Sequence, residues 1–257
     1  MRIMTYNIKY ANEEDGENSW SYRKEALTGL LQYFEPAVIG LQEAMQEQLQ
    51  YFKQNLQQYH QLGVGRKDGK TEGEFTPILY RSDKFDVLKS DTFWLSETPE
   101  KPSKGWDAAY PRICTYALFQ HKETGKEFYF FNTHFDHKGD EARKKSAALI
   151  FNKSQEFNKE NLPVILTGDL NLEPDTEPVH FLAEKFCDSR ELSKTASFGP
   201  EKTFNAYHFE EEPVNRIDYI FTSRKGVEVE KYGVLNNSYD QKYPSDHFPV
   251  MVELQLK

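Results

Sequence analysis

The stretch Pro163–Asn171 has the sequence PVILTGDLN. Its first residues form a short apolar run with the length and composition of a buried strand. Gly168 ends this run, and the polar residues Asp169–Asn171 follow it as a turn. A helical pattern around Val179–Phe186 comes next. This part of the chain therefore predicts a buried strand followed by a helix.

The first half of the chain shows the same succession of strand and helix. Residues Arg2–Ile8 predict a strand that carries the polar Asn7. Apolar residues at helical spacing predict one helix that ends before Pro36, and a second helix of the same period follows the buried run Ala37–Leu41. Glu43 lies just past the C-terminal end of that run.

Strand patterns dominate the middle and the last third of the chain. They lie at Pro77–Tyr80, Phe85–Leu95, Ile113–Phe119, Phe128–His134, Ile217–Phe221, Val227–Val234 and Phe248–Leu256. Strands followed by helices in each half, with strand pairs between them, predict an α/β fold in which two mixed sheets pack face to face and helices cover the outside. No stretch has the composition of a linker or a repeat, so we expect residues 1–257 to form a single domain.

Composition limits the class of protein. The 257 residues are 38% hydrophobic and 14% aromatic, which is enough to bury a substantial core. A charged fraction of 28% argues against membrane insertion, and 19 Phe with 15 Tyr argue against a disordered chain. The net charge of -9 does not suit a dedicated binder of polyanions, so phosphate chemistry here would depend on local cations.

The two cysteines and the N-terminus bear on the compartment. Cys114 and Cys187 are each flanked by apolar residues, as small buried hydrophobic residues are, and two cysteines make neither a disulfide framework nor a metal cluster. The N-terminus shows no basic segment followed by a long apolar run, which a signal peptide would need. The expected location is the cytoplasm.

Six apolar strands end in, or are preceded by, polar residues that a buried strand does not need. These residues are Asn7, Glu43, Asn132–His134, Asp169–Asn171, Asp218 and the pair Asp246–His247. Any one of them alone is more often a cap or turn residue. As a set, they predict one site at an edge where the strand ends converge.

The residue types in this set indicate its chemistry. Carboxylate and amide oxygens are the ligands that Mg²⁺ or Mn²⁺ prefers, and they do not suit zinc. They come from Asn7, Glu43, Asp169, Asn171 and Asp246. Two histidines of the set are then available for proton transfer, although a single histidine in a sequence is often only a surface residue.

The same segments resemble the ordered motifs of the endonuclease/exonuclease/phosphatase superfamily, which includes DNase I and exonuclease III. The matching segments are Thr5–Asn7, Leu41–Glu43, Asn132–His134, Gly168–Asn171, Arg216–Ile220 and Ser245–Val250. They span nearly the whole chain in the order of the family. The resemblance implies a DNase I-like, four-layer α/β sandwich and Mg²⁺-dependent hydrolysis of phosphate esters, with Mn²⁺ as the alternative ion.

The resemblance also implies a role for each metal-site and water-site position. Asn7 and Glu43 resemble the primary metal ligands, with Asp246 nearby. Asp169 and Asn171 resemble the pair that aligns the attacking water and contacts the phosphate. The number of metal ions is left open.

Three further positions resemble the family's proton-transfer residues. His247, oriented by Asp218, resembles the histidine at the reacting phosphate, and His134 resembles the histidine near the leaving group. Asp169 and His247 are both assigned to catalysis, and the resemblance leaves open which of them takes the proton of the water.

Three more residues are candidates for binding the substrate. Arg112 resembles a phosphate-contacting arginine of the family, and the alternative is a solvated charge at a strand start. Trp94 and Trp106 surround a loop that resembles a bacterial branch of the superfamily. The two tryptophans either line the substrate site or pin a long loop to the core.

The sequence therefore predicts a metal-dependent phosphoesterase that hydrolyses a phosphodiester or a phosphomonoester by attack of water at phosphorus. A nuclease acting on DNA or RNA is the alternative, and a catalytically inactive phosphate-binding module is a further one. The densest cationic run, Arg143–Lys145, falls on a helical pattern where it would form a solvated face. We therefore expect a monomer that acts on a small molecule or a short nucleic acid in preference to long duplex DNA, without membrane insertion.

Overall fold

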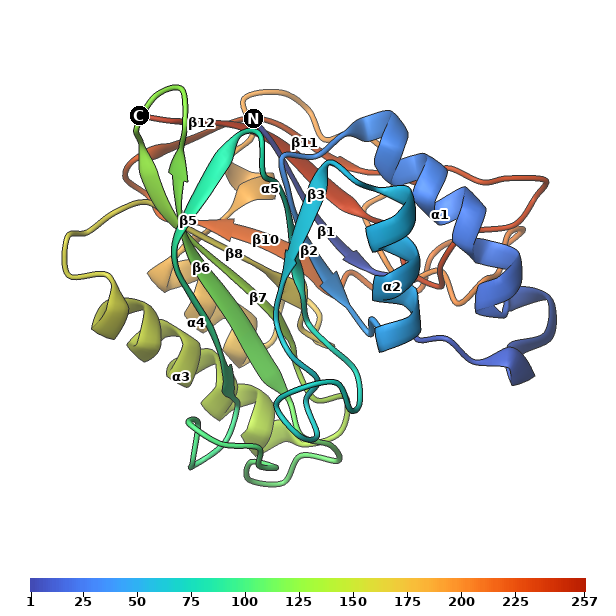
Figure 1. Cartoon of the computed structure of the whole chain (residues 1–257), viewed down its shortest axis with the longest axis horizontal. Helices are drawn as coiled ribbons and strands as arrows, with labels where there is room; N and C mark the ends of the chain where they lie inside the picture. The colour runs from blue at the N-terminus through green and yellow to red at the C-terminus, as the bar shows by residue number, and fades with distance from the viewer.

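Two six-stranded β-sheets lie face to face in the computed structural model, which describes residues 1–257 (Figure 1). The strand order of the first sheet is β11 (Val227–Val234), β12 (Val250–Leu256), β1 (Arg2–Asn7), β2 (Val38–Gln42), β4 (Ile78–Arg81) and β3 (Tyr59–Leu62). The strand order of the second sheet is β5 (Phe85–Trp94), β6 (Ile113–His121), β7 (Glu127–His134), β8 (Val164–Asp169), β10 (Asp218–Thr222) and β9 (Cys187–Asp188).

Each sheet is mixed because it contains one parallel pair among antiparallel ones. β1 pairs in parallel with β2, and β7 pairs in parallel with β8. In the second pair His134 lies opposite Asp169, and the antiparallel neighbour β10 begins with Asp218, also opposite Asp169. The register thus brings the polar ends of three strands to one edge of the sheet.

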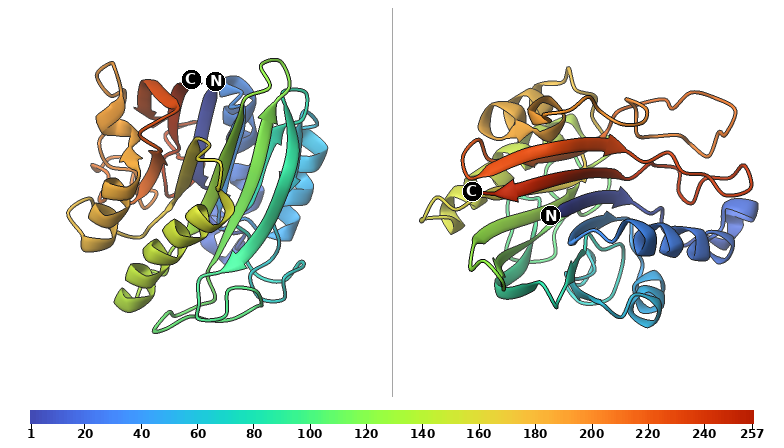
Figure 2. Two further views of the ribbon diagram at one scale, coloured as in Figure 1. Left: turned by 90° about the vertical axis from the view of Figure 1, so that its left-hand side faces the viewer. Right: turned by 90° about the horizontal axis from the view of Figure 1, so that it is seen from above.

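Helices cover the two outer faces (Figure 2). α1 (Trp20–Phe34) and α2 (Gln46–Asn55) pack on the first sheet, and α3 (Asp140–Phe157) and α4 (Glu177–Lys185) pack on the second. The short helix η1 (Glu13–Asn18) precedes α1, and the short helix α5 (Ser189–Leu192) contacts β10 of one sheet and β11 of the other. The four-layer α/β sandwich predicted from the sequence is confirmed.

Alternate residues along the central strands serve different cores. Ile3 of β1 packs between the two sheets, whereas its neighbour Met4 packs under the helices of the first sheet. In β7, Phe130 faces the other sheet and Phe131 faces α3 and α4. Both faces of these strands are buried, and this explains why they appear in the sequence as nearly continuous apolar runs.

A buried asparagine joins the two sheets close to the polar edge. The Oδ1 atom of Asn132 in β7 accepts hydrogen bonds from Gln42 Nε2 at 2.7 Å and from Thr167 Oγ1 at 3.0 Å. Its Nδ2 donates to the carbonyl oxygen of Leu41 at 2.7 Å. A Cβ atom at Gly40 would lie 2.4 Å from Asn132 Oδ1, so only glycine allows this close approach. These bonds fix the strand ends of one sheet relative to the other.

Most of the predicted elements are present with boundaries shifted by a few residues, and the elements that sequence reasoning missed are short. β3 is an edge strand whose His60 and Gln61 are exposed or partly exposed, so it lacks an apolar pattern. β9 has two residues. The prediction for the cysteines is confirmed, since Cys114 and Cys187 are both free and buried. No helix combines the length and apolar character that a membrane span requires.

Candidate active site

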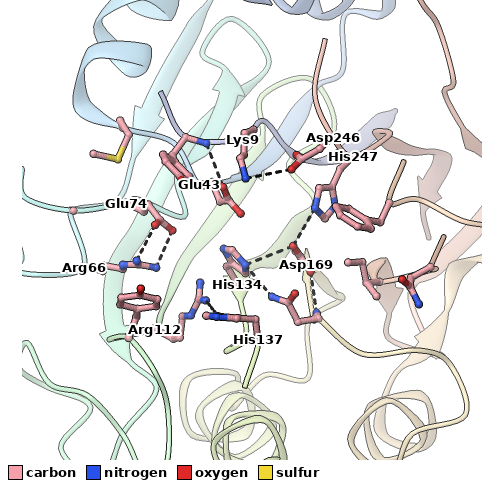
Figure 3. Close-up of a pocket in the computed structure, with 18 of the residues that line it drawn as sticks. Lys9, Glu43, Arg66, Glu74, Arg112, His134, His137, Asp169, Asp246 and His247 are labelled. Carbon is pink, nitrogen blue, oxygen red and sulfur yellow. Dashed lines mark hydrogen bonds and ion pairs between the residues drawn. The ribbon is translucent and has the colours of Figure 1, made fainter. Parts of the chain in front are cut away.

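A cavity of about 750 Å³ opens where the strand ends of both sheets meet (Figure 3). Seven of the sequence-predicted site residues line it: Glu43, Arg112, His134, Asp169, Asn171, Asp246 and His247. Asn7 and Asp218 lie directly behind this lining, fully buried and hydrogen-bonded to it. The structure thus brings nine predicted residues together at one site.

Two of these residues have a left-handed backbone that turns the chain at a strand end. Glu43 follows β2 with φ 59°, and Asn171 follows β8 with φ 50°. The main chain NH of Asn171 donates to Asp169 Oδ1 at 2.8 Å, which closes a tight turn after the strand. Left-handed non-glycine residues are unfavourable and gather at functional sites, where surrounding contacts hold them.

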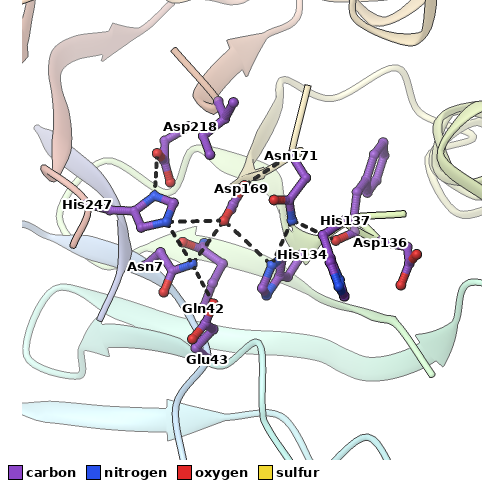
Figure 4. Close-up of polar contacts among 12 residues, drawn as sticks. Asn7, Gln42, Glu43, His134, Asp136, His137, Asp169, Asn171, Asp218 and His247 are labelled. Carbon is purple, nitrogen blue, oxygen red and sulfur yellow. Dashed lines mark hydrogen bonds and ion pairs between the residues drawn. The ribbon is translucent and has the colours of Figure 1, made fainter. Parts of the chain in front are cut away.

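Asn7 connects two of the carboxylates (Figure 4). Its Nδ2 donates to Glu43 Oε1 at 3.1 Å and to Asp169 Oδ2 at 2.9 Å. The second oxygen of Glu43 accepts from the main chain NH of Tyr10 at 3.2 Å. The amide therefore sets the positions of two carboxylates that belong to different sheets.

A lysine shows that this corner of the cavity attracts cations. Lys9 Nζ lies 3.3 Å from Asp246 Oδ2. Burial lowers the pKa of Lys9, but the carboxylates of Asp246 and Glu43 outweigh burial and raise it. Asn7, Glu43 and Asp246 offer only oxygen ligands, so the donor set fits a hard divalent cation.

A second group of potential ligands consists of Asp169, Asp218 and His247, whose ligand atoms lie within 4.8 Å of one another. In this group His247 Nδ1 and Asp218 Oδ2 are already hydrogen-bonded at 2.8 Å. Both side chains are buried. This pair engages one ligand atom of each residue, and an ion held instead by Asn7, Glu43 and Asp246 would have to displace Lys9 Nζ from Asp246.

The Asp218–His247 pair determines the charge of the imidazole. Burial by itself lowers the pKa of His247, but the Asp218 carboxylate overcomes this and raises the pKa to about 10. The other ring nitrogen, Nε2, lies 3.8 Å from Asp169 Oδ2. Burial, and then the charge of Asp218, raise the pKa of Asp169. His247 is thus a cation at neutral pH next to a carboxyl group of increased basicity.

His134 lies on the other side of Asp169 and is neutral. Its Nε2 is 3.1 Å from Asn171 Nδ2 and 3.5 Å from Asp169 Oδ2. Burial and the charge of Arg112 lower the pKa of His134 well below its usual range. Its Nδ1 is buried without a hydrogen-bond partner.

Ion pairs form the far wall of the cavity, opposite His247 and Asp246 in Figure 3. Arg66 makes two hydrogen bonds to Glu74, at 2.8 Å and 2.7 Å. Arg112 Nε lies 3.4 Å from Asp136 Oδ1, and its Nη2 lies 3.2 Å from His137 Nδ1. Arg112 is only 5% exposed, which does not agree with a solvated charge at a strand start.

Sequence reasoning missed Lys9 and most of this wall. Asp136 and His137 follow His134 so closely that their spacing was a usable signal. Arg66 and Glu74 lie in a polar loop between β3 and β4 that matches no motif. Only their position in the folded chain brings them to the cavity.

The structure places Trp94 and Trp106 outside the cavity lining, which favours the alternative that they hold a loop over the alternative that they line the substrate site. Trp94 is 5% exposed, and its Nε1 donates to the carbonyl oxygen of Arg66 at 2.8 Å. The main chain NH of Trp106 donates to the carboxylate of Glu97. Trp94 holds the loop that carries Arg66, so its contribution to the site is indirect.

Comparisons with known proteins agree with this geometry. The sequence model described as the Endonuclease/Exonuclease/phosphatase family matches residues 4–247. The structure of a mannosyl-6-phosphatase from Bacteroides thetaiotaomicron VPI-5482 superposes with a TM-score of 0.96 at 40% identity, over 100% of both chains.

Of two other similar proteins, one is named only by the family and one is uncharacterized. An endonuclease/exonuclease/phosphatase family protein from Bacteroides thetaiotaomicron has a TM-score of 0.94 at 41% identity, over 99% of this chain and 97% of its own. An uncharacterized protein of Acanthamoeba polyphaga mimivirus is 27% identical over 98% of this chain and 99% of its own.

Proposed function

The chain belongs to the Endonuclease/Exonuclease/phosphatase family, and from this premise we propose that it is a Mg²⁺-dependent phosphomonoesterase that acts on a sugar phosphate. As a member of this family it is a hydrolase of phosphate esters. The observation that carries the narrower proposal is the cavity, whose volume of about 750 Å³ is typical of a small-molecule site. The full-length similarity to a mannosyl-6-phosphatase supports the same class of substrate.

We assign the metal site to Asn7, Glu43 and Asp246, with Mn²⁺ as the alternative to Mg²⁺. The cation-attracting corner around Lys9 and the oxygen-only donor set support this assignment. A divalent cation held there would neutralise charge on the nonbridging oxygens of the phosphate.

The remaining residues act on the water and the phosphate. Asp169, held by Asn7 and by the turn at Asn171, orients the attacking water and accepts its proton. His247 already carries a proton because of Asp218, so it has no lone pair for the water and instead donates a charged hydrogen bond to a phosphate oxygen. Asn171 contacts the phosphate.

The leaving side of the phosphate is assigned to His134 and Arg112. His134 is neutral, and its buried Nδ1 has no partner in the protein. Arg112 Nη1 is also buried without a partner. An unpaired buried donor is costly, so both nitrogens favour a ligand that supplies an acceptor.

We further propose that residues 1–257 act as one domain and as a monomer. Both sheets contribute residues to the cavity, and every proposed role falls within one chain. Size-exclusion chromatography with light scattering would test the monomer.

The test of the proposed function compares two substrates at physiological salt with Mg²⁺. We expect release of phosphate from mannose 6-phosphate and little nicking of supercoiled plasmid. The variant His247→Ala is the control that ties either activity to this cavity. Rapid nicking without phosphate release from the sugar ester would make the protein a nuclease and refute the proposal.

A further inference from the structure

We propose that the Arg66–Glu74 pair and Tyr110 form a subsite that binds the hydroxyl groups and the ring of the neutral sugar part of the substrate. The inference rests on the proposed function and adds to it the residues that select the leaving group. Arg66 and Glu74 lie across the cavity from His247, as the labelled side chains in Figure 3 show, and Tyr110 lines the same cavity.

The hydrogen bonds of the ion pair leave capacity for a ligand. The side chains of Arg66 and Glu74 are 9% and 19% exposed, so both are largely removed from water. Each oxygen of the Glu74 carboxylate accepts one hydrogen bond from the guanidinium and retains a further lone pair. Glu74 is therefore held rigidly by Arg66 while it can still accept a hydrogen bond from a hydroxyl group.

The same wall also presents unused donors. Arg66 Nε and Arg112 Nη1 are both buried without a partner. They border a small pocket that Glu74 and His134 also line. That pocket of about 10 Å³ has room for one water at most, so a sugar hydroxyl would bond to the Glu74 carboxylate from the main cavity and reach a guanidinium nitrogen only through a bridging water.

The charges of the wall favour a neutral ligand over a second anion. Arg66 is paired with Glu74, and Arg112 lies beside Asp136, so the two positive charges are balanced by two negative ones. Arg112 also points Nη2 at His137 Nδ1, which requires an unprotonated nitrogen there. A second phosphate group at Glu74 would meet the repulsion of that carboxylate, and the one lysine or arginine of the cavity lining without an ion pair, Lys67, is exposed.

Tyr110 supplies an apolar surface beside these polar groups. Tyr110 is 51% exposed, and the Arg66 guanidinium lies 5.2 Å from the centroid of its ring. The ring of His137 is stacked on it at 5.9 Å with an interplanar angle of 21°. A half-exposed aromatic ring next to hydrogen-bonding groups suits the combined apolar and polar character of a sugar ring.

The experiment compares mannose 6-phosphate with n-propyl phosphate, which has the same primary ester linkage and no hydroxyl groups. We expect Glu74→Gln to lower the ratio of the kcat/KM values, sugar ester over propyl ester, by at least about tenfold. Tyr110→Leu is expected to raise KM for the sugar ester by several-fold without a matching change for the propyl ester. It changes an exposed side chain, so it remains informative if Glu74→Gln fails to fold.

The matched control is Asp83→Asn. Arg81 and Asp83 form the same kind of two-point pair, at 2.8 Å and 2.8 Å, but they do not line the cavity. This variant should leave the substrate ratio at the wild-type value. An unchanged ratio in both Glu74→Gln and Tyr110→Leu, or equal losses on both esters, would overturn the subsite.

A binding measurement separates this inference from the proposed function. Saturation-transfer NMR with free mannose, in the absence of metal, should show contact with the wild-type protein and weaker contact with Tyr110→Leu. If neither ester is hydrolysed but mannose binds in this way, the proposed function fails and the subsite stands. If the sugar ester is hydrolysed but free mannose makes no contact and the substrate ratios are unchanged, the subsite fails alone.

Discussion

Replacement of Asp218 by asparagine removes the charge that holds His247 protonated and keeps the shape of the side chain. In the structure His247 Nδ1 and Asp218 Oδ2 are 2.8 Å apart, and both residues are buried. Burial lowers the pKa of His247 and the Asp218 carboxylate raises it to about 10, against an ordinary value of 6.5. Without that carboxylate, burial is opposed only by the smaller effects of Asp169 and Asp246, and we expect the imidazole to be neutral at pH 7.

The pKa sets the size of the effect. The difference between about 10 and 6.5 is about 3.5, which at about 1.36 kcal/mol for each pKa unit corresponds to about 5 kcal/mol, or roughly 3,000-fold. Only part of this energy affects the rate, because a neutral imidazole can still donate one hydrogen bond to the phosphate. We therefore expect kcat of Asp218→Asn to fall by about 100-fold to 1,000-fold, in the range for a positioned proton donor.

The assay measures kcat for the wild type, Asp218→Asn, His247→Ala and the double variant at saturating Mg²⁺ and substrate. Because Asp218 acts through His247, the double variant should lie within about threefold of His247→Ala. Losses that multiply would refute the reasoning, since they would show that the two residues act independently. Asp188→Asn is the control, because Asp188 pairs with Arg216 in the same sheet region and lies outside the cavity lining.

Three further predictions concern the metal, the pH dependence and the joint between the sheets. Activity should be lost in EDTA and restored by Mg²⁺ or Mn²⁺. In calorimetry, Glu43→Ala should weaken Mg²⁺ binding while its circular dichroism spectrum stays that of the wild type. An unchanged affinity for Mg²⁺ would remove Glu43 from the ligand set. The pKa of His247 is raised in the folded protein, so the contribution of its charge to stability is complete below about pH 6.5 and is lost as the pH rises through about 10. In EDTA, the Tm of the wild type should therefore fall more steeply between these pH values than the Tm of His247→Ala. Parallel curves would contradict the pairing of His247 with Asp218. Asn132→Ala should lower the free energy of unfolding by roughly 2–4 kcal/mol in urea titrations, because it leaves buried polar partners in both sheets unpaired, and a change below about 1 kcal/mol would show that the joint is unimportant.

Sequence reasoning reaches the catalytic end of the cavity because local patterns determine it. A strand pattern gives the position of each strand end, and polar residues at those ends stand out against the apolar run, as Asp169 does after Val164–Thr167. Parallel pairing of β7 with β8 then places His134 opposite Asp169. What the sequence could not give was the pairing itself, since that depends on contacts between distant segments.

The far wall escapes sequence reasoning for a physical reason. Arg66 and Glu74 face each other because their loop folds back on itself, with Arg66 N bonded to the carbonyl oxygen of Glu74 at 3.0 Å. A Cβ atom at Gly65 would lie 2.4 Å from the carbonyl oxygen of Glu72, so this compact turn needs glycine. None of these features has a periodic pattern that a sequence could display.

Trp94 shows how a residue can be singled out in the sequence while two different contacts remain open for it. Its large side chain and its position before Arg112 mark it as unusual in the sequence, and the structure uses it to fix the main chain of Arg66. It therefore affects the site through the position of the Arg66–Glu74 pair and not by touching the cavity.

The two ends of the cavity consequently differ in how well they should tolerate amino-acid substitutions. The catalytic end is built from strand termini held by sheet register and by the Asn132 joint, so a shift of one residue there would turn the side chains to the opposite face. The far wall is carried by a loop that tolerates substitution, provided that the turn at Gly65 and the support from Trp94 remain. If the proposed subsite is right, substitutions at Arg66, Glu74 or Tyr110 should alter which alcohol leaves the phosphate while the chemistry proposed for Asp169 and His247 is retained.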